Sequence, residues 1–259
     1  GSIGFGMFLL NFSKPENFQP FILISVIFSC ALIPILLTKR KAPTFKKIAT
    51  MNIRDLYKAS PLGAVCALLF GATQSAFFML LAVYGASMNF SIFEISFVTF
   101  LVGISGAISQ YPVGYLSDKL DRRLVIIYSS FGASIFAIMA IFSVKTMFLP
   151  EGLASSKSWF FIFLVLFSFC SLPIFSQILA HTNDFITKDK FVSAGAGLQF
   201  AFGLGAMSGP LLCSLVMDLM GPNGFFMFHI FFHLIIGFFG IHRMKARPVK
   251  ENPDSQFVP

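Results

Sequence analysis

The chain has 259 residues, of which 56% are hydrophobic and only 12% are charged, with a formal net charge of +8. A soluble domain carries roughly 25% charged residues, and a globule with so little charge could not cover its surface with polar groups. The composition therefore excludes an ordinary soluble domain and indicates a protein whose solvent is lipid. The positive charge does not indicate a nucleic-acid partner, because no basic face remains once the apolar runs are set aside.

The chain opens with two apolar runs of different length. Residues 3–12 are too few to cross a bilayer, which needs about 20 residues, whereas residues 17–38 are long enough. We interpret the first run as the end of a helix that begins before this chain. Residues 1–38 are then the end of an N-terminal bundle, and the chain is a fragment of a longer protein.

Further apolar runs of spanning length follow in regular order. They lie at 60–86, 91–116, 124–145, 158–181, 190–220 and 224–242. Glycine and proline occur within them and are tolerated in membrane helices, since neighbouring helices can satisfy the freed backbone groups. The runs predict an all-α, polytopic membrane helix bundle, with a six-helix unit over residues 60–243.

The connecting segments separate sharply by their lysine and arginine content, as the positive-inside rule requires of a correct span assignment. Alternate connections hold sixteen of the nineteen basic residues, and the other connections hold only Lys14, Lys145 and Lys157. We therefore expect the basic connections and the C-terminus to be cytoplasmic. Residues 39–59 are predicted to be a basic cytoplasmic linker, and residues 244–259 a disordered tail.

The connection at 114–123, GYLSDKLDRR, carries an ordered motif of glycine, leucine, aspartate and basic residues. It resembles the signature of the major facilitator superfamily, which lies on the cytoplasmic loop between the second and third helices of each six-helix half. The resemblance implies that the chain covers the end of helix 5 through helix 12 of a twelve-helix transporter. The motif positions are Gly114, Leu116, Asp118, Lys119, Arg122 and Arg123. Asp121 stands where the family usually has glycine, which leaves the turn geometry open.

Elementary physics suggests how such a motif works. A glycine allows a neighbouring helix to approach closely, and a carboxylate at a helix end can accept hydrogen bonds from exposed N–H groups of another helix. The resemblance implies that these contacts close one side of the transporter and break when that side opens. Asp184, at the inner end of the span 158–181, is expected to pair with Arg122 or Arg123 in the outward-facing state. A solvated helix end is the alternative reading.

A second motif lies in the span 190–220. Gly205 and Gly209 are four residues apart on one helix face, which favours close helix packing, and Pro210 removes one helical hydrogen bond. The segment resembles the glycine–proline motif of the family's antiporters.

The family's architecture implies a substrate cavity near the bilayer midplane, between the two halves. Polar residues near mid-span are the candidates for it, although most such groups only bond helix to helix. They are Gln74, Ser75, Ser105, Ser176, Gln177 and Gln199. Glu94 is interpreted as part of a capping box with Ser91 rather than as a mid-span carboxylate. His229 and His233 are expected near the external interface, without the further ligands that a metal site needs.

The sequence therefore predicts a secondary active transporter in the plasma membrane, the inner membrane of the cell, that moves a small solute by alternating access. Its expected partners are the solute, membrane lipid and the missing N-terminal helices, and no cofactor is indicated. The alternative is a non-transporting protein of the same fold that acts as a sensor or scaffold. An enzyme is not expected, because the chain shows no catalytic constellation, metal cluster or phosphate-binding loop.

Overall fold

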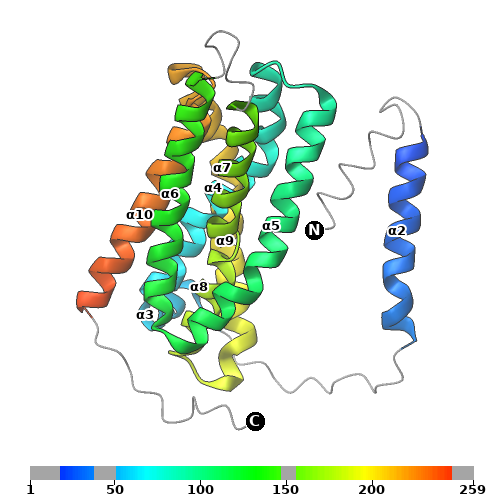
Figure 1. Ribbon diagram of the computed structural model, residues 1–259. Helices are drawn as coiled ribbons and strands as arrows, with labels where there is room; N and C mark the ends of the chain where they lie inside the picture. Colours follow the sequence, from blue (N-terminus) through cyan, green and yellow to red (C-terminus); the bar gives the residue numbers. More distant parts are fainter. Residues whose placement is uncertain (1–17, 38–50, 147–155, 247–259) are drawn as a thin grey trace.

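The computed structural model describes residues 18–37, 51–146 and 156–246, and their regular structure is helical (Figure 1). Helices long and apolar enough to cross a membrane number six in these ranges. They comprise α4 (Pro61–Ser87), α5 (Ile92–Lys119), α6 (Arg122–Thr146), the pair α7 (Ser156–Ser171) and α8 (Ile174–Asn183), α9 (Phe191–Met220) and α10 (Gly224–Ala246). The predicted fold class, a polytopic helix bundle, is confirmed.

The six-helix unit runs up and down with short connections, and its ends alternate between two faces (Figure 1). The predicted span at 17–38 corresponds to α2 (Gln19–Leu36), which is drawn apart from the bundle in Figure 1. The short run at 3–12, most of the linker before residue 51 and the tail after residue 246 lie outside the described residues. The division into an N-terminal remnant, linker, bundle and tail stays a prediction.

The span predicted as one helix over 158–181 is interrupted, which corrects the sequence interpretation. α7 ends at Ser171 and α8 begins at Ile174, with Leu172 and Pro173 between them. A proline cannot donate the backbone hydrogen bond that continues a helix, and its ring clashes with the carbonyl four residues earlier. Pro112 and Pro210 lie inside α5 and α9 without ending them, so the presence of a proline does not by itself determine where a span is interrupted.

The linker contains a helix that the sequence analysis did not anticipate. α3 (Ile53–Ala59) ends one residue before α4, and the intervening Ser60 caps α4 by accepting a hydrogen bond from the Gly63 N–H at 3.2 Å. The Thr182 hydroxyl donates to Ser60 Oγ at 3.2 Å and so ties this corner to α8. Leu56 of α3 is fully buried. The last part of the linker is thus fixed to the bundle.

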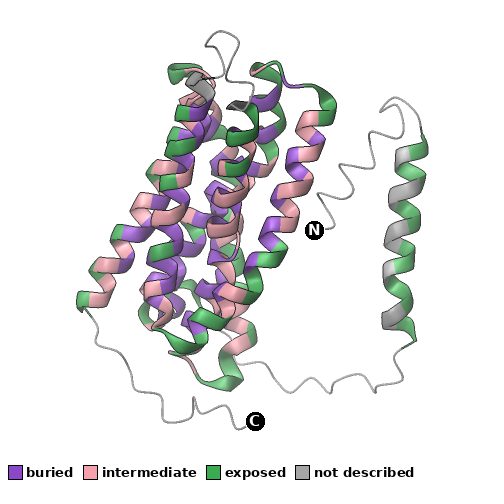
Figure 2. Ribbon diagram, in the orientation of Figure 1, coloured by how far each residue is buried: buried purple, intermediate pink, exposed green. Residues whose placement is uncertain are grey.

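Buried residues lie toward the centre of the bundle, while exposed residues follow its outer faces (Figure 2). One core cluster is rich in aromatic rings; Phe225 and Tyr84 lie 5.2 Å apart between ring centroids. His229 and His233 are buried within this region, and their expected depth near the external interface stays a prediction. His233 Nε2 lies 2.8 Å from Ser171 Oγ, and His229 Nε2 lies 3.1 Å from the Thr73 carbonyl. Hydrogen bonding between α10 and its neighbours explains the burial of these polar rings.

The tightest helix contact joins α4 and α9 across glycines. A Cβ added at Gly205 would overlap the backbone carbonyl of Leu68, and one added at Gly209 would overlap that of Ala72. From the other helix, a Cβ at Gly71 would overlap the carbonyl of Phe202. Because the obstacles are backbone atoms, no side-chain rotation can relieve them. The predicted packing face of Gly205 and Gly209 is therefore the face on which α9 meets α4.

This contact generates a prediction about stability. Gly205→Ala and Gly209→Ala should each lower the stability of the purified chain, by about 1–3 kcal/mol, because an added methyl forces the two backbones apart. The measurement is the thermal unfolding midpoint in detergent.

Gly203→Ala is the matched control on the same helix, since no atom lies within 4 Å of its added Cβ. It should be neutral or stabilising, because alanine favours a helix over glycine. Equal unfolding midpoints for all three variants would contradict the close backbone contact.

Candidate functional site

The motif at 114–123 forms a tight turn between two membrane helices. α5 ends at Lys119 and α6 begins at Arg122, and the Leu120 N–H donates to the Leu116 carbonyl at 2.8 Å. Only two residues separate the helices, so the charged side chains of residues 118–123 project from one compact turn. We call this turn the joint. Within the described ranges, Asn89 is the non-glycine residue with a positive φ. Asp121 thus needs none of the backbone freedom of the glycine usual at its position.

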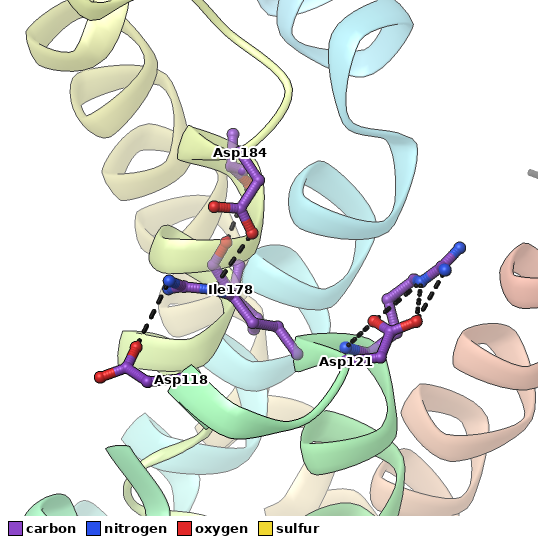
Figure 3. Close-up of polar contacts among 7 residues, drawn as sticks. Asp118, Asp121, Ile178 and Asp184 are labelled. Atoms are coloured by element: carbon purple, nitrogen blue, oxygen red, sulfur yellow. Dashed lines mark hydrogen bonds and ion pairs between the residues drawn. The ribbon is translucent and has the colours of Figure 1, made fainter. Parts of the chain in front are cut away.

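Asp121 caps the start of α6. Its carboxylate accepts from the Arg123 backbone N–H at 2.9 Å, and the Leu124 N–H donates to its carbonyl at 2.9 Å. The same carboxylate accepts from the Arg123 guanidinium, with Nη2 at 2.7 Å and Nε at 3.0 Å from Oδ2 (Figure 3). A carboxylate in this position satisfies free N–H groups and complements the helix dipole. Asp121 therefore fixes the conformation of the turn through these hydrogen bonds.

Arg122 points from the same turn toward a different partner. Its Nε lies 3.1 Å from Asp184 Oδ2, just beyond the end of α8, and its Nη2 lies 3.5 Å from Asp118 Oδ1 (Figure 3). Of the two arginines proposed as partners of Asp184, Arg122 makes the pair. The contact joins the beginning of α6 to the end of α8, whereas Arg123 and Asp121 bond within one turn. The 3.1 Å pair thus makes an ionic link between separate elements of this joint.

The two central carboxylates experience opposite electrostatic environments. Burial acts to raise the pKa of Asp121, but the hydrogen bonds and charge of Arg123 outweigh it and hold that pKa below its usual value. At Asp184 burial dominates and raises the pKa; the nearby Asp121 and Asp118 charges add to burial, and Arg122 offsets only part. The fold therefore favours the ionised form of Asp121 and disfavours that of Asp184.

The remaining motif residues face outward. A Cβ added at Gly114 would meet no atom within 4 Å, so the expected close approach of a neighbouring helix is not made within the described part of the chain. Leu116 is 47% exposed, and Lys119 Nζ lies 4.3 Å above the Tyr115 ring. The Asp118 side chain is 73% exposed, and its described ion pair is the one with Arg122. This outer side of the turn is open to contact by other parts of the protein.

The opposite end of the bundle carries a simpler ionic contact. Ser91 and Glu94 form the predicted capping box at the start of α5. The Glu94 carboxylate also lies 3.0 Å from Lys157 Nζ at the start of α7. Glu94 is thus a structural residue of the helix end, as the sequence suggested.

The six polar candidates for a substrate cavity do not bond to one another. Ser75 donates to the Ala72 carbonyl, and Ser105 donates to the Val165 carbonyl at 2.8 Å, linking α5 to α7. Ser176 donates to Gln110 Oε1 at 3.0 Å. Gln110 was not among the predicted candidates, although its polar side chain inside the apolar span 91–116 is a signal of the same kind.

The amides among the candidates differ in exposure. Gln177 is buried and its Oε1 has no hydrogen-bond partner among the described residues, Gln74 is half-buried and Gln199 is exposed. No group of three or more histidine, cysteine, aspartate or glutamate side chains in the described ranges could hold a metal ion.

Comparison with known proteins agrees with the motif and the helix arrangement. The Major Facilitator Superfamily profile matches residues 2–150 and, in a second match, residues 63–258. The chain is 20% identical over 258 residues to the uncharacterized MFS-type transporter YE1530 of Yersinia enterocolitica, covering 98% of this chain and 61% of that protein. It is 19% identical over 202 residues to the uncharacterized MFS-type transporter YcaD of Escherichia fergusonii, covering 77% of this chain and 49% of that protein.

The chain thus spans less than two thirds of the length of either curated relative. The second family match alone covers most of the six-helix bundle, including the charged turn and the glycine contact. The chain belongs to the Major Facilitator Superfamily of membrane transporters.

Proposed function

We propose that this chain is the C-terminal portion of a secondary active transporter that moves a small solute by alternating access. The observation that carries the proposal is the ion pair of Arg122 with Asp184 at one end of the bundle. Because it links the joint between α5 and α6 to the end of α8, it can form and break as these ends move. The family supplies the general class, a membrane transporter.

The network combines a fixed contact with a labile one. Arg123 and its partner Asp121 are largely buried, with side chains 5% and 18% exposed, and belong to one helix start. Arg122 and Asp184 are 28% and 38% exposed and belong to different elements. Partly solvated ion pairs are individually weak, so a modest change in helix position suffices to break the second pair while the first persists. We propose that the second pair is the state-dependent gate contact and the first its hinge.

The proposal requires a second group of helices facing the bundle. Of the six described spans, the one that contains α9 is the least covered. In its most apolar stretch of 18 residues, 22% are buried, whereas 44–56% are buried in the other five spans. Phe200, Met207 and Leu211 are among the exposed side chains of α9, each at least 60% exposed. These residues support a partner surface for N-terminal helices, with lipid covering what those helices leave free. The solute would bind between the halves, near the candidates on α4, α5, α8 and α9.

The orientation follows from charge. The joint and the C-terminal end of α10 lie at the basic end of the bundle, which the positive-inside rule assigns to the cytoplasm. We propose that the protein lies in the plasma membrane, the inner membrane of the cell, with its C-terminus cytoplasmic.

A charge exchange tests the gate. In proteoliposomes of the full-length transporter, a screen of small polar solutes first identifies one that is carried. Arg122→Asp and Asp184→Arg should then each reduce its transport at least tenfold, because each places like charges together. The double exchange should recover a substantial part of the rate. Uptake of the identified solute is the measurement.

Lys157→Gln, at the opposite end, is the control and should retain most of the transport. A double variant as inactive as the single ones, although folded and inserted, would refute the pairing. Absence of flux for every solute tested would instead favour the sensor or scaffold.

The opposite pKa shifts at the joint predict opposite effects on stability. Asp121→Asn should lower the unfolding midpoint at neutral pH, because it removes the carboxylate charge to which Arg123 donates. The expected loss in the free energy of unfolding is about 1–3 kcal/mol. Asp184→Asn should leave the midpoint unchanged or raise it, because the neutral amide avoids the desolvation cost of a partly buried charge. Thermal unfolding of the two variants and the wild type measures both effects.

The same experiment repeated at lower pH checks the sign. The wild-type contribution of Asp121 is present above the usual aspartate pKa and is lost as pH falls through its lowered pKa. The cost of Asp184 is absent below the usual aspartate pKa and develops as pH rises toward its raised pKa. At acid pH, the unfolding midpoints of both variants should therefore approach that of the wild type. A stability loss in Asp184→Asn as large as that in Asp121→Asn would show that the assignment is wrong.

A further inference from the structure

α3 carries two different stripes on its exposed side. Ile53 and Tyr57 are 44% and 52% exposed, and they are four residues apart, so they lie on one face of the helix. Arg54 and Lys58, also exposed and four residues apart, form a neighbouring cationic stripe. Adjacent apolar and cationic stripes are typical of a helix at the boundary between hydrocarbon and lipid headgroups, where tyrosine is also favoured.

The bundle holds α3 in place. Its buried Leu56 packs against Gly197 of α9. A Cβ added to Gly197 would lie only 2.9 Å from Leu56 Cδ2. Together with the corner at Ser60, this contact fixes which side of α3 faces outward. α3 lies at the same end of the bundle as the turn between α5 and α6 (Figure 1). The two stripes are thus presented by a rigid support.

A hollow of about 450 Å³ opens beside α3. Lys58 lines it from α3, and Lys190 lines it from the short 3-10 helix η2 (Lys188–Lys190) that precedes α9. Thr187 and Asp55 supply further polar groups, while apolar wall comes from Met51, Phe185 and Ile186. α3 and η2 together carry four cations, Arg54, Lys58, Lys188 and Lys190, against two carboxylates, Asp55 and Asp189.

We propose that α3 and the facing segment 185–190 form a binding site for the headgroup of an anionic phospholipid in the cytoplasmic leaflet. The phosphate lies between Lys58 and Lys190, Arg54 contacts neighbouring headgroups, and Ile53 and Tyr57 enter the upper acyl region. Hydroxyls of a glycerol headgroup can donate to Asp55. The site rests on the proposed orientation but not on transport, so it stands even if the protein carries nothing.

The chemistry favours a lipid over a cytosolic protein. Cations alone would suit any acidic partner, but here they adjoin an apolar stripe at the level where the membrane helices end. Anionic lipids concentrate at the cytoplasmic surface and attract juxtamembrane lysine and arginine. An acidic peptide would leave Ile53 and Tyr57 exposed to water.

Phosphatidylglycerol binding to the full-length transporter tests the site. The intact protein is placed in nanodiscs of phosphatidylcholine with increasing phosphatidylglycerol, and the rise of its unfolding midpoint is followed. Lys58→Gln and Lys190→Gln should each shift the half-maximal phosphatidylglycerol fraction upward by about fivefold, the usual contribution of one cation near an anionic surface. Both lysines are exposed, so neither change should impair folding.

Each variant is compared with itself in pure phosphatidylcholine. Lys157→Gln, at the opposite end of the bundle, is the matched control, and its response to phosphatidylglycerol should equal that of the wild type. A wild type without any response, or a double variant Lys58→Gln/Lys190→Gln that responds as the wild type does, would overturn the proposal. A double variant that loses the response while Ser105→Ala/Ser176→Ala keeps it would support a lipid site separate from the solute path.

Discussion

The structure depends on the high free-energy cost of placing a charge in hydrocarbon. In the described spans the ion-paired side chains stand near helix ends: Glu94 and Lys157 at one end of the bundle, and the residues of the 118–123 turn with Asp184 at the other. Polar side chains deeper in the spans are neutral and mostly bond to backbone carbonyls, as Ser105 and Ser130 do. Charge is therefore available for function only at the two surfaces. At the basic surface, the described ion pairs gather at the 118–123 turn and Asp184.

Within the hydrocarbon region, shape replaces charge as the organising factor. α4 and α9 approach through Gly71, Gly205 and Gly209 so closely that any side chain would meet a backbone carbonyl. Small residues that permit such contacts are the usual means of helix association in membranes. This contact holds together the two helices that flank the predicted solute path, and in the proposed mechanism it is the rigid support against which the ionic joint moves. The break at Pro173 lies on a third helix, between the joint and the opposite surface. It leaves α8, which leads to Asp184, as a short helix separate from α7.

Features with a strong one-dimensional signal could be predicted from the sequence. Six spans, the capping box at Ser91 and the packing face of Gly205 and Gly209 each follow from length, spacing or hydrophobicity. The pairing of Asp184 could be narrowed to two arginines but not to one, because the choice depends on how Asp121 engages Arg123. That engagement is a property of three-dimensional capping geometry.

Other features escaped prediction for identifiable reasons. The seven residues of α3 are too few and too polar to stand out within a basic linker, and its burial depends on one leucine meeting a glycine of α9. A proline alone does not reveal whether it interrupts a span, since Pro112 lies inside α5 whereas Pro173 lies between α7 and α8. The burial of His229 and His233 depends on carbonyl and hydroxyl partners from α4 and α7, which no spacing along α10 reveals.

The central claim is that the ionic joint at 118–123 lies on the cytoplasmic face, and cysteine accessibility tests it most directly. In the full-length protein without its native cysteines, one cysteine replaces Leu120, which is 47% exposed at the joint, and another, in a separate variant, replaces the exposed Ser87 at the opposite end. An impermeant maleimide added to whole cells should label Ser87→Cys and spare Leu120→Cys until the membrane is permeabilised. Labelling of Leu120→Cys from outside, with Ser87→Cys protected, would contradict the orientation and the gate built on it.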